Sequence, residues 1–295
     1  MKKNYYSSVR ASLGAVFTLL PFLFLVILGI TLKSSNFPFS ATVADAAIAA
    51  KASAPVKSEG DGFDAPEDAA KAYLEGLRDG DLHRMISAFA IETFIEKASF
   101  EATLRWLRAY TPNGDVLPNA NEFVTSLSVE NRRGSIVRII RHQYFSLCGV
   151  GLNSAPQKME DEAHIGRFVD QFTKNLNKFK LPTLQVVGFV PPEKLSDKYS
   201  SERNQENLAL IAETYGADRR VSGVAVFKLD GNMCALLFDA DKYGDKWYLA
   251  GLGGNIAALM GVNAGLYGMI IVPREWEKEW EEKWGSYLIP IDSQK

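Results

Sequence analysis

The chain has 295 residues, of which 47% are hydrophobic and 23% are charged, and its formal net charge is -2. This composition is that of an ordinary globular protein, long enough for one or two domains. A charge so close to neutral predicts neither a basic nucleic-acid-binding surface nor a long acidic tail. We therefore expect no nucleic acid among its partners.

The first 33 residues predict a membrane segment. The run LGAVFTLLPFLFLVILGITL (residues 13–32) lies in an uncharged window from Ala11 to Leu32. At about 1.5 Å of rise per residue, a helix over this window covers the ~30 Å hydrocarbon core of a bilayer. Because Lys2, Lys3 and Arg10 precede it, the positive-inside bias keeps the N-terminus in the cytoplasm and exports the residues after Lys33. The alternative is a buried core helix, but the window has no amphipathic face.

Residues 1–33 act either as an uncleaved anchor or as a signal peptide that is removed. The apolar run exceeds the ~7 to 15 residues of a usual signal peptide, which favours the anchor, and the cleavage pattern Ala44-Asp45-Ala46 lies well downstream. Residues 34–63 are rich in Ala, Ser and Gly and predict a flexible tether. We expect a single-pass cell-membrane protein with its C-terminal domain outside, or a secreted protein; the N-terminal helix makes the membrane a partner.

The exported domain, residues 64–295, opens with a predicted helix. Asp64 can cap its start, and Pro66 suits the first helical turn. Gly80 can take the left-handed conformation that ends a helix, and Asp81 can cap a second helix that starts at Leu82. Apolar side chains recur at three- and four-residue steps and form one stripe: Ala69, Ala70, Tyr73, Leu74 and Leu77.

This opening resembles the first helix of nuclear transport factor 2-like domains, which have a cystatin-like cone fold. The resemblance is carried by Ala65–Ala69, Tyr73-Leu74 and Asp79–Leu82, and Lys246–Leu249 is similar to a late tryptophan-bearing strand of the family. It implies helices packed on a curved antiparallel sheet around a cavity, here in an exported bacterial protein. Some members of the family are isomerases or dehydratases that use an acid or a base inside the cavity.

The rest of the domain divides into helical and strand-rich parts. Helical periodicity dominates residues 82–180, which predicts a large helical insertion. About four strand-rich runs follow between residues 184 and 252, and the Asp230-Gly231-Asn232 turn predicts a hairpin. Residues 253–295 predict a helical tail. Helices followed by an antiparallel meander indicate the α+β class.

Two patterns could bind a cofactor, and each has a simpler explanation. The run GLGGN (residues 251–255) follows a strand and could bind phosphate, but it breaks the dinucleotide spacing, so a tight turn is the better interpretation. Glu160, Asp161 and His164 could form half of a metal site, but the spacing has no second copy, which favours a solvated helix face. We expect no metal and no cofactor.

A catalytic acid or base is the one enzymatic feature that the resemblance implies. The best-placed carboxylate is Asp239, at the end of the run MCALLFD, with Tyr248 as a hydrogen-bond donor. Burial would raise the pKa of this carboxyl group and make it a usable base. The alternative, an exposed carboxylate in a turn, is the stronger expectation.

The tail and the two cysteines give the remaining candidates. Trp276, Trp280 and Trp284 recur every four residues and place three indole rings on one helix face. That face either packs on the domain or binds a partner or the membrane. Cys148 and Cys234 can form a disulfide in an exported protein, or they can be two buried free thiols.

The sequence favours a non-catalytic function at the cell surface, namely ligand binding or protein interaction. Export, a fold that often encloses a cavity, and the lack of a catalytic motif support this expectation. The alternative is an isomerase- or hydratase-like enzyme that uses a buried carboxylate. A structural spacer that presents the tryptophan face is a third hypothesis.

Overall fold

The structure is a computed structural model that describes residues 59–110, 116–148, 160–177, 181–260, 268–271, 282 and 285–290. The predicted membrane segment (1–33), most of the tether (34–58) and Trp276, Trp280 and Trp284 lie outside these residues. Within them, no helix has both the length and the apolar character needed to cross a bilayer.

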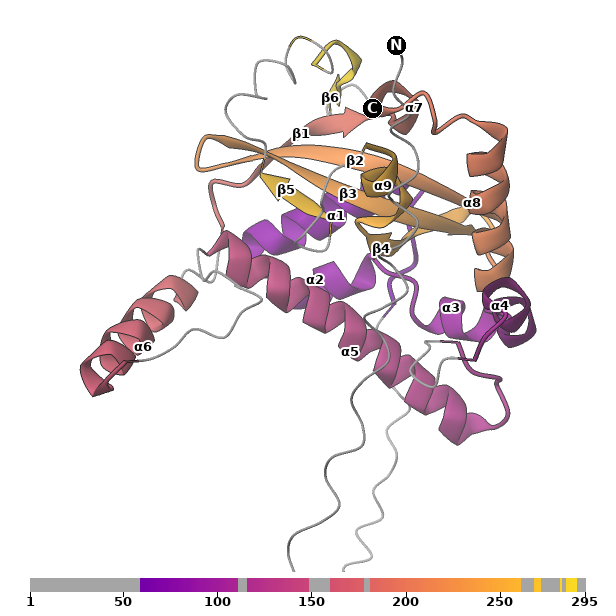
Figure 1. The fold of residues 1–295 in the computed structure, drawn as a ribbon, viewed down its shortest axis with the longest axis horizontal. Coiled ribbons are helices and arrows are strands. Elements are labelled where there is room, and N and C mark those ends of the chain that lie inside the picture. Colours follow the sequence, from indigo (N-terminus) through magenta and orange to yellow (C-terminus); the bar gives the residue numbers. More distant parts are fainter. Residues whose placement is uncertain are drawn as a thin grey trace, which may run out of the picture. The chain divides into compact units, whose positions relative to one another are not determined.

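Helices precede and interrupt a single antiparallel sheet (Figure 1). The helices are α1 (Pro66–Asp79), α2 (Leu82–Ser87), α3 (Glu92–Lys97), α4 (Phe100–Leu107), α5 (Glu122–Leu147), α6 (Glu162–Leu176), α7 (Pro192–Leu195), α8 (Glu202–Tyr215) and α9 (Gly254–Met260). The strands are β1 (Gln185–Val190), β2 (Arg219–Leu229), β3 (Asn232–Tyr243), β4 (Lys246–Leu252), β5 (Met269–Ile271) and β6 (Ile289–Pro290). The predicted α+β class is confirmed.

The sheet is built on the long β2–β3 hairpin. Its strand order is β4-β3-β2-β1-β6, and β5 pairs with β3 beyond the end of β4. Asp230 and Gly231 both have positive φ at the tip, so the predicted hairpin is confirmed. A β-bulge between Asp239 and Ala240 shifts the register with β4, so that Asp241 lies opposite Tyr248.

Both faces of the sheet are buried, which explains why the central strands are almost continuously apolar. One face, which includes Ala225 and Phe227 of β2, packs with α1, α2 and α5. The other face, which includes Val224 and Val226, packs with α8 and α9 through Leu208 and Ile256. Helices on both sides therefore leave little of β2 and β3 in contact with solvent.

Two expectations about the later elements need correction. Helix α8 interrupts the strand-rich region, because an amphipathic helix was needed to cover the second face of the sheet. The tail is not wholly helical, since β5 and β6 add strands to the sheet. The four strands predicted between residues 184 and 252 are present as β1 to β4, and with β5 and β6 the sheet has six strands in the described part of the chain. Residues 261–267, 272–281, 283–284 and 291–295 of the tail lie outside the described chain.

The helix-end predictions are confirmed except for one. Gly80 has φ 69° at the end of α1, and the Asp81 carboxylate accepts a hydrogen bond from the backbone N–H of Arg84. Asp64 does not cap α1; its carboxylate instead lies 2.7 Å from Nζ of Lys246 on β4. The partner of the Asp64 carboxylate is therefore Lys246 of β4 and not a backbone N–H group of α1.

Residues 59–63, assigned to the tether from their composition, bind closely to the domain. Glu59 is buried, and its Oε2 accepts hydrogen bonds of 2.8 Å from the backbone N–H groups of Ile91 and Thr93, at the start of α3. Phe63 and Trp247 exchange two backbone hydrogen bonds, of 2.7 and 3.0 Å. This segment covers part of the edge of β4 and satisfies free N–H groups of α3.

Replacing Glu59 with Ala should lower the free energy of unfolding by about 1–3 kcal/mol, because it leaves buried N–H groups of α3 without an acceptor. Urea denaturation checks this. The control is Glu96→Ala, at an exposed position of α3, which should change the free energy of unfolding by less than about 0.5 kcal/mol. Equal losses in the two variants would contradict the assigned role of Glu59.

Candidate functional site

A buried charged cluster lies on the sheet face that packs with α8. We call Arg220 of β2 together with Asp239 and Asp241 of β3 the Arg220 cluster. Nη2 of Arg220 lies 3.6 Å from Oδ2 of Asp239, and its Nη1 lies 3.6 Å from Oδ2 of Asp241. All three residues are buried. One guanidinium group therefore forms ion pairs with two neighbouring carboxylates inside the protein.

The two carboxylates of the Arg220 cluster have different surroundings. Asp239 accepts a hydrogen bond of 2.6 Å from the Ser222 hydroxyl, whereas neither carboxylate oxygen of Asp241 has a hydrogen bond within the described residues. Burial raises the pKa of Asp241 to about 6; Arg220 opposes this rise and Asp239 adds to it. The Asp241 carboxyl group therefore binds a proton at a higher pH than an exposed aspartate does.

The turn formed by GLGGN lies directly against Asp239. Gly253 and Gly254 have φ of 94° and 50°, and they lead into α9. A Cβ atom on Gly254 would come within 1.9 Å of Oδ2 of Asp239. The glycine is required by this close approach as well as by its backbone angle, which agrees with the tight-turn interpretation.

Asp239 and Tyr248 do not form the predicted pair. Asp239 is buried within β3 and is not an exposed turn residue, because β3 continues to Tyr243. The residue opposite Tyr248 is Asp241, and the Tyr248 hydroxyl donates a 3.4 Å hydrogen bond to the Gly60 carbonyl. Burial, together with the nearby Glu59 carboxylate, raises the pKa of Tyr248 to about 12.

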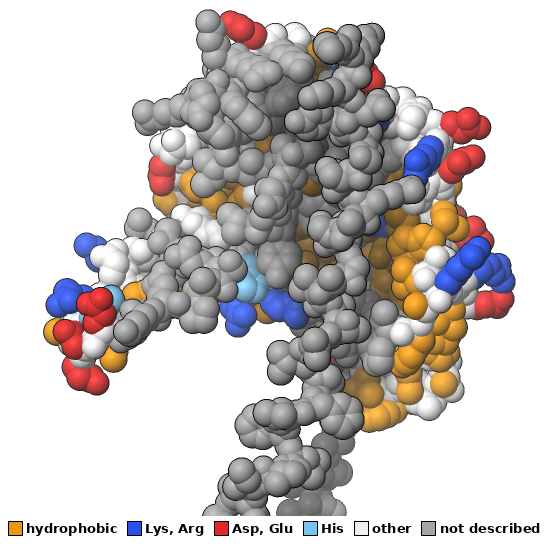
Figure 2. Space-filling model, in the orientation of Figure 1, with side chains coloured by type: hydrophobic (Ala, Val, Ile, Leu, Met, Phe, Trp, Pro, Cys, Tyr) orange, Lys and Arg blue, Asp and Glu red, His pale blue; other side chains and the backbone are white. Residues whose placement is uncertain are grey.

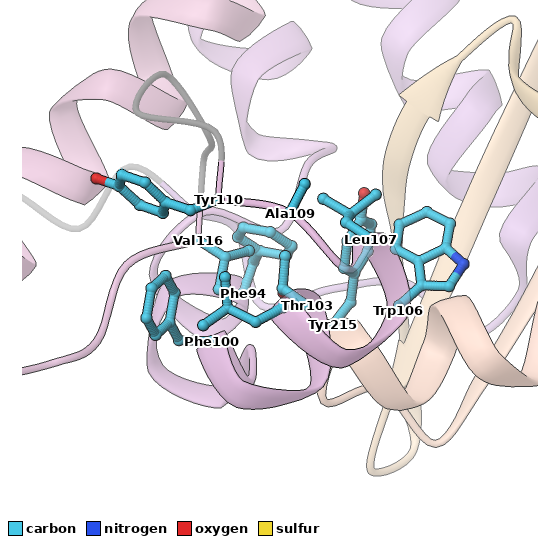
Figure 3. A pocket seen from close by; sticks show the side chains of 10 residues that line it. Phe94, Phe100, Thr103, Trp106, Leu107, Ala109, Tyr110, Val116 and Tyr215 are labelled. Carbon is cyan, nitrogen blue, oxygen red and sulfur yellow. The ribbon is translucent and has the colours of Figure 1, made fainter.

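An apolar pocket lies between α3, α4 and the end of α8 (Figure 3). We call it the α4 pocket. Its volume is about 140 Å³, and no charged side chain lines it. The lining residues are Phe94, Phe100, Thr103, Leu104, Trp106, Leu107, Ala109, Tyr110, Val116 and Tyr215. Figure 3 shows Phe94, Thr103 and Tyr215 near the middle and Trp106 and Tyr110 at opposite ends.

Helix α4 is amphipathic, but it has no buried residue. Trp106, Leu107 and Tyr110 have exposed fractions of 37%, 43% and 59%. Figure 2 shows hydrophobic side chains gathered on the side of the molecule where α3, α4 and the end of α8 lie. Large apolar groups at the rim of an apolar pocket are typical of interaction surfaces.

Aromatic contacts connect the α4 pocket to the Arg220 cluster. The guanidinium carbon of Arg220 lies 4.9 Å from the centroid of the Tyr215 ring, and Arg132 of α5 lies 4.5 Å from the centroid of Phe94. Phe94 and Tyr215 pack edge to face with centroids 5.0 Å apart. The Tyr243 hydroxyl donates a hydrogen bond to the Tyr215 carbonyl. Tyr215 therefore lines the α4 pocket and also contacts Arg220 of the cluster.

A polar groove between α8 and α9 is a second candidate surface. It is open, and its lining includes Lys198, Arg203, Asn204 and Asn255. Nδ2 of Asn255 donates to Oδ1 of Asn204, and Nδ2 of Asn204 donates to the Tyr199 carbonyl. These amides are occupied by internal hydrogen bonds, so the groove offers fewer free polar groups than its composition suggests.

The two cysteines and the group Glu160, Asp161 and His164, which the sequence also singled out, lie in the described part of the chain. Cys148 and Cys234 are both buried and are not joined by a disulfide, and burial raises the pKa of Cys234 to about 11. Asp161 caps α6 by accepting a hydrogen bond from the backbone N–H of His164, and Nδ1 of His164 accepts from the backbone N–H of Glu160. In the described part of the chain, no three His, Cys, Asp or Glu side chains are grouped as metal ligands.

No protein-family model matches the sequence, and no curated protein matches it. A cystatin-like protein from Ruminococcus gnavus has a similar solved structure, with 17% sequence identity and a TM-score of 0.34. The alignment covers 62% of this chain and 39% of that protein. The chain therefore spans less than half the length of this structural neighbour.

Asp241→Asn should stabilise the protein at pH 8 by on the order of 1–3 kcal/mol, because it removes a buried charge whose folded pKa exceeds its unfolded value. The folded state binds this proton more tightly than the unfolded state does. The wild type should therefore gain stability as pH falls from about 7 to 4, and its difference from the variant should shrink.

Urea denaturation of both proteins at several pH values measures this difference. Asp245→Asn, at an exposed position, is the matched control and should show almost no difference from the wild type at any pH. A difference between wild type and Asp241→Asn that stays constant from pH 8 to pH 4.5 would contradict the raised pKa of Asp241.

Proposed function

We propose that the domain is a non-catalytic protein-interaction module whose binding site is the α4 pocket. The observation that carries the proposal is the combination of an apolar pocket with the exposed rim residues Trp106, Leu107 and Tyr110. Exposed aromatic groups around a desolvated pocket are the usual form of an interaction hot spot.

The size of the α4 pocket favours a protein partner over a metabolite. Pockets for small-molecule ligands usually have about 300–1,000 Å³. The 140 Å³ of the α4 pocket is close to the volume of an apolar cavity that holds one benzene molecule. One side chain of a partner fits such a space, and the rest of the partner would contact the rim.

The enzyme alternative has less support from the geometry. Asp239 is occupied by the Ser222 hydroxyl and by Arg220, which leaves it poorly suited to act as a general base. Neither Asp239 nor Tyr248 lines the α4 pocket or the α8–α9 groove.

We also propose a nuclear transport factor 2-like fold and an extracytoplasmic location. The packing of α1 on the antiparallel sheet, together with the sequence motif that opens α1, supports the fold. The uncharged window at Ala11–Leu32 and the basic residues before it support export, with the N-terminal segment in the membrane or removed.

The binding proposal predicts that indole, as a probe of one aromatic ring, binds the α4 pocket with a dissociation constant on the order of millimolar, as expected for so small a ligand. NMR titration of the full chain measures this. Ala109→Phe, which fills the pocket from a loop position, should weaken binding by about tenfold or more. Phe123→Ala, at an α5 position with 72% exposure, is the control and should bind like the wild type. Absence of saturable binding in the wild type would overturn the proposal.

The export proposal predicts that the full chain expressed in bacteria is degraded by protease added to spheroplasts, because residues 64–295 lie outside the membrane. Replacing two leucines near the middle of the apolar run with Lys, as in Leu20→Lys with Leu23→Lys, should leave the protein protected, because each charge at the centre of a span costs about 2.5–3.5 kcal/mol. Protection of the unmodified chain would contradict export.

A further inference from the structure

We infer that binding by the α4 pocket depends on pH, because a proton on Asp241 weakens the hold of Arg220 on Tyr215, which lines the pocket. This inference rests on the proposed function and adds a regulation of the same site. The lining itself contains no histidine and no carboxylate. A change in the affinity for an uncharged ligand between pH 8 and pH 5 must therefore come from groups outside the lining, and the Arg220 cluster is in contact with it.

Arg220 is held over the Tyr215 ring from two sides. Its Nη2 lies 3.6 Å from Oδ2 of Asp239, and its Nη1 lies 3.6 Å from Oδ2 of Asp241, its partner in the β2–β3 register. The guanidinium carbon between these nitrogens lies 4.9 Å from the centroid of the ring. The place of the guanidinium group over the ring is therefore set by its attraction to both carboxylates.

The Asp241 side of this arrangement depends on charge alone. Nη1 of Arg220 and both carboxylate oxygens of Asp241 are buried and have no hydrogen bond within the described residues. Asp239, by contrast, also accepts a 2.6 Å hydrogen bond from the Ser222 hydroxyl. A proton on Asp241 would remove its attraction for Arg220, and no hydrogen bond between the two groups would keep them together.

The charged and titratable groups around Asp241 come from several elements. They are Arg220 of β2, Asp239 and Tyr243 of β3, Tyr248 of β4 and Arg132 of α5, together with Tyr215 of α8 and Glu59, which act through Arg220 and the two other tyrosines. Burial raises the pKa of Asp241 to about 6; the arginines oppose this rise and Asp239 adds to it. Burial also raises the pKa values of Tyr243 and Tyr248, so both hydroxyl groups keep their protons from pH 5 to pH 8. Asp241 therefore gains a proton as the pH falls through this range.

The loss of the Asp241 charge reaches the pocket through the Tyr215 ring. Arg220 is then drawn to Asp239 alone and leaves its place over the ring. The Tyr215 backbone stays in place, because the Tyr243 hydroxyl donates a 3.2 Å hydrogen bond to its carbonyl. The ring itself can turn away from Phe94, which it meets edge to face with centroids 5.0 Å apart, and both rings line the pocket. Fewer ring contacts are then available to a bound aromatic group, so binding weakens at low pH.

Indole, which carries no charge between pH 5 and pH 8, tests the inference by NMR titration of the full chain. The dissociation constant of the wild type should rise about threefold from pH 8 to pH 5, the size of effect expected for one cation–π contact. Asp241→Asn is neutral at every pH and should bind indole at pH 8 as weakly as the wild type does at pH 5. Asp245→Asn, at an exposed position, should keep the pH dependence of the wild type. A pH dependence in Asp241→Asn equal to that of the wild type would overturn the inference.

The NMR signals of the Tyr215 ring separate the inference from the proposed function. In protein labelled at tyrosine, with Tyr215→Phe to assign the signals, they should shift between pH 8 and pH 5 in the wild type and stay constant in Asp241→Asn, without any ligand. Constant Tyr215 signals in the wild type would overturn the inference whatever indole does. Indole that binds with one affinity at every pH would overturn the inference and leave the proposed function intact. Absence of indole binding at every pH would reject the proposed function, and the Tyr215 signals would still show whether the proton moves the ring.

Discussion

The pairing of one arginine with two aspartates across the β2–β3 hairpin is the interaction on which much of this fold depends. The sheet is covered on both faces, so Asp239 and Asp241 are removed from water wherever the helices pack. Two buried carboxylates side by side would repel each other strongly without Arg220. The guanidinium group also stacks on Tyr215, which fixes the end of α8 against the same face. The α4 pocket is thus built on a helix end that the charged cluster positions.

Features that depend on a few consecutive residues could be predicted from the sequence. Gly80 and Asp81 end one helix and start the next, and Asp230-Gly231 forms the hairpin, because each conformation is set by local backbone preference and by one nearby hydrogen bond. That Asp64 does not cap α1 could not be predicted, since its partner Lys246 is 182 residues away in the sequence.

The candidate site could be predicted only in part, for the same physical reason. The sequence singles out Asp239 as a candidate carboxylate. The polar residues after the run MCALLFD nevertheless suggest a turn, because their ion pairs with Arg220 on the neighbouring strand cannot be read from the sequence. The apolar residues of α4 are visible as helical periodicity. That Trp106, Leu107 and Tyr110 remain exposed depends on how α4 sits against α8, and periodicity alone assigns such residues to the core.

The attachment of Glu59 has a mechanical consequence. Any tension that reaches the domain along the chain from its N-terminal side is taken up first by the bonds of Glu59 to the start of α3 and then by the pairing of Phe63 with β4. Helix α3 also contributes Phe94 to the α4 pocket. The helix that carries a pulling force is therefore the one that shapes the proposed binding site, so force on the tether and occupancy of the pocket act on the same short element.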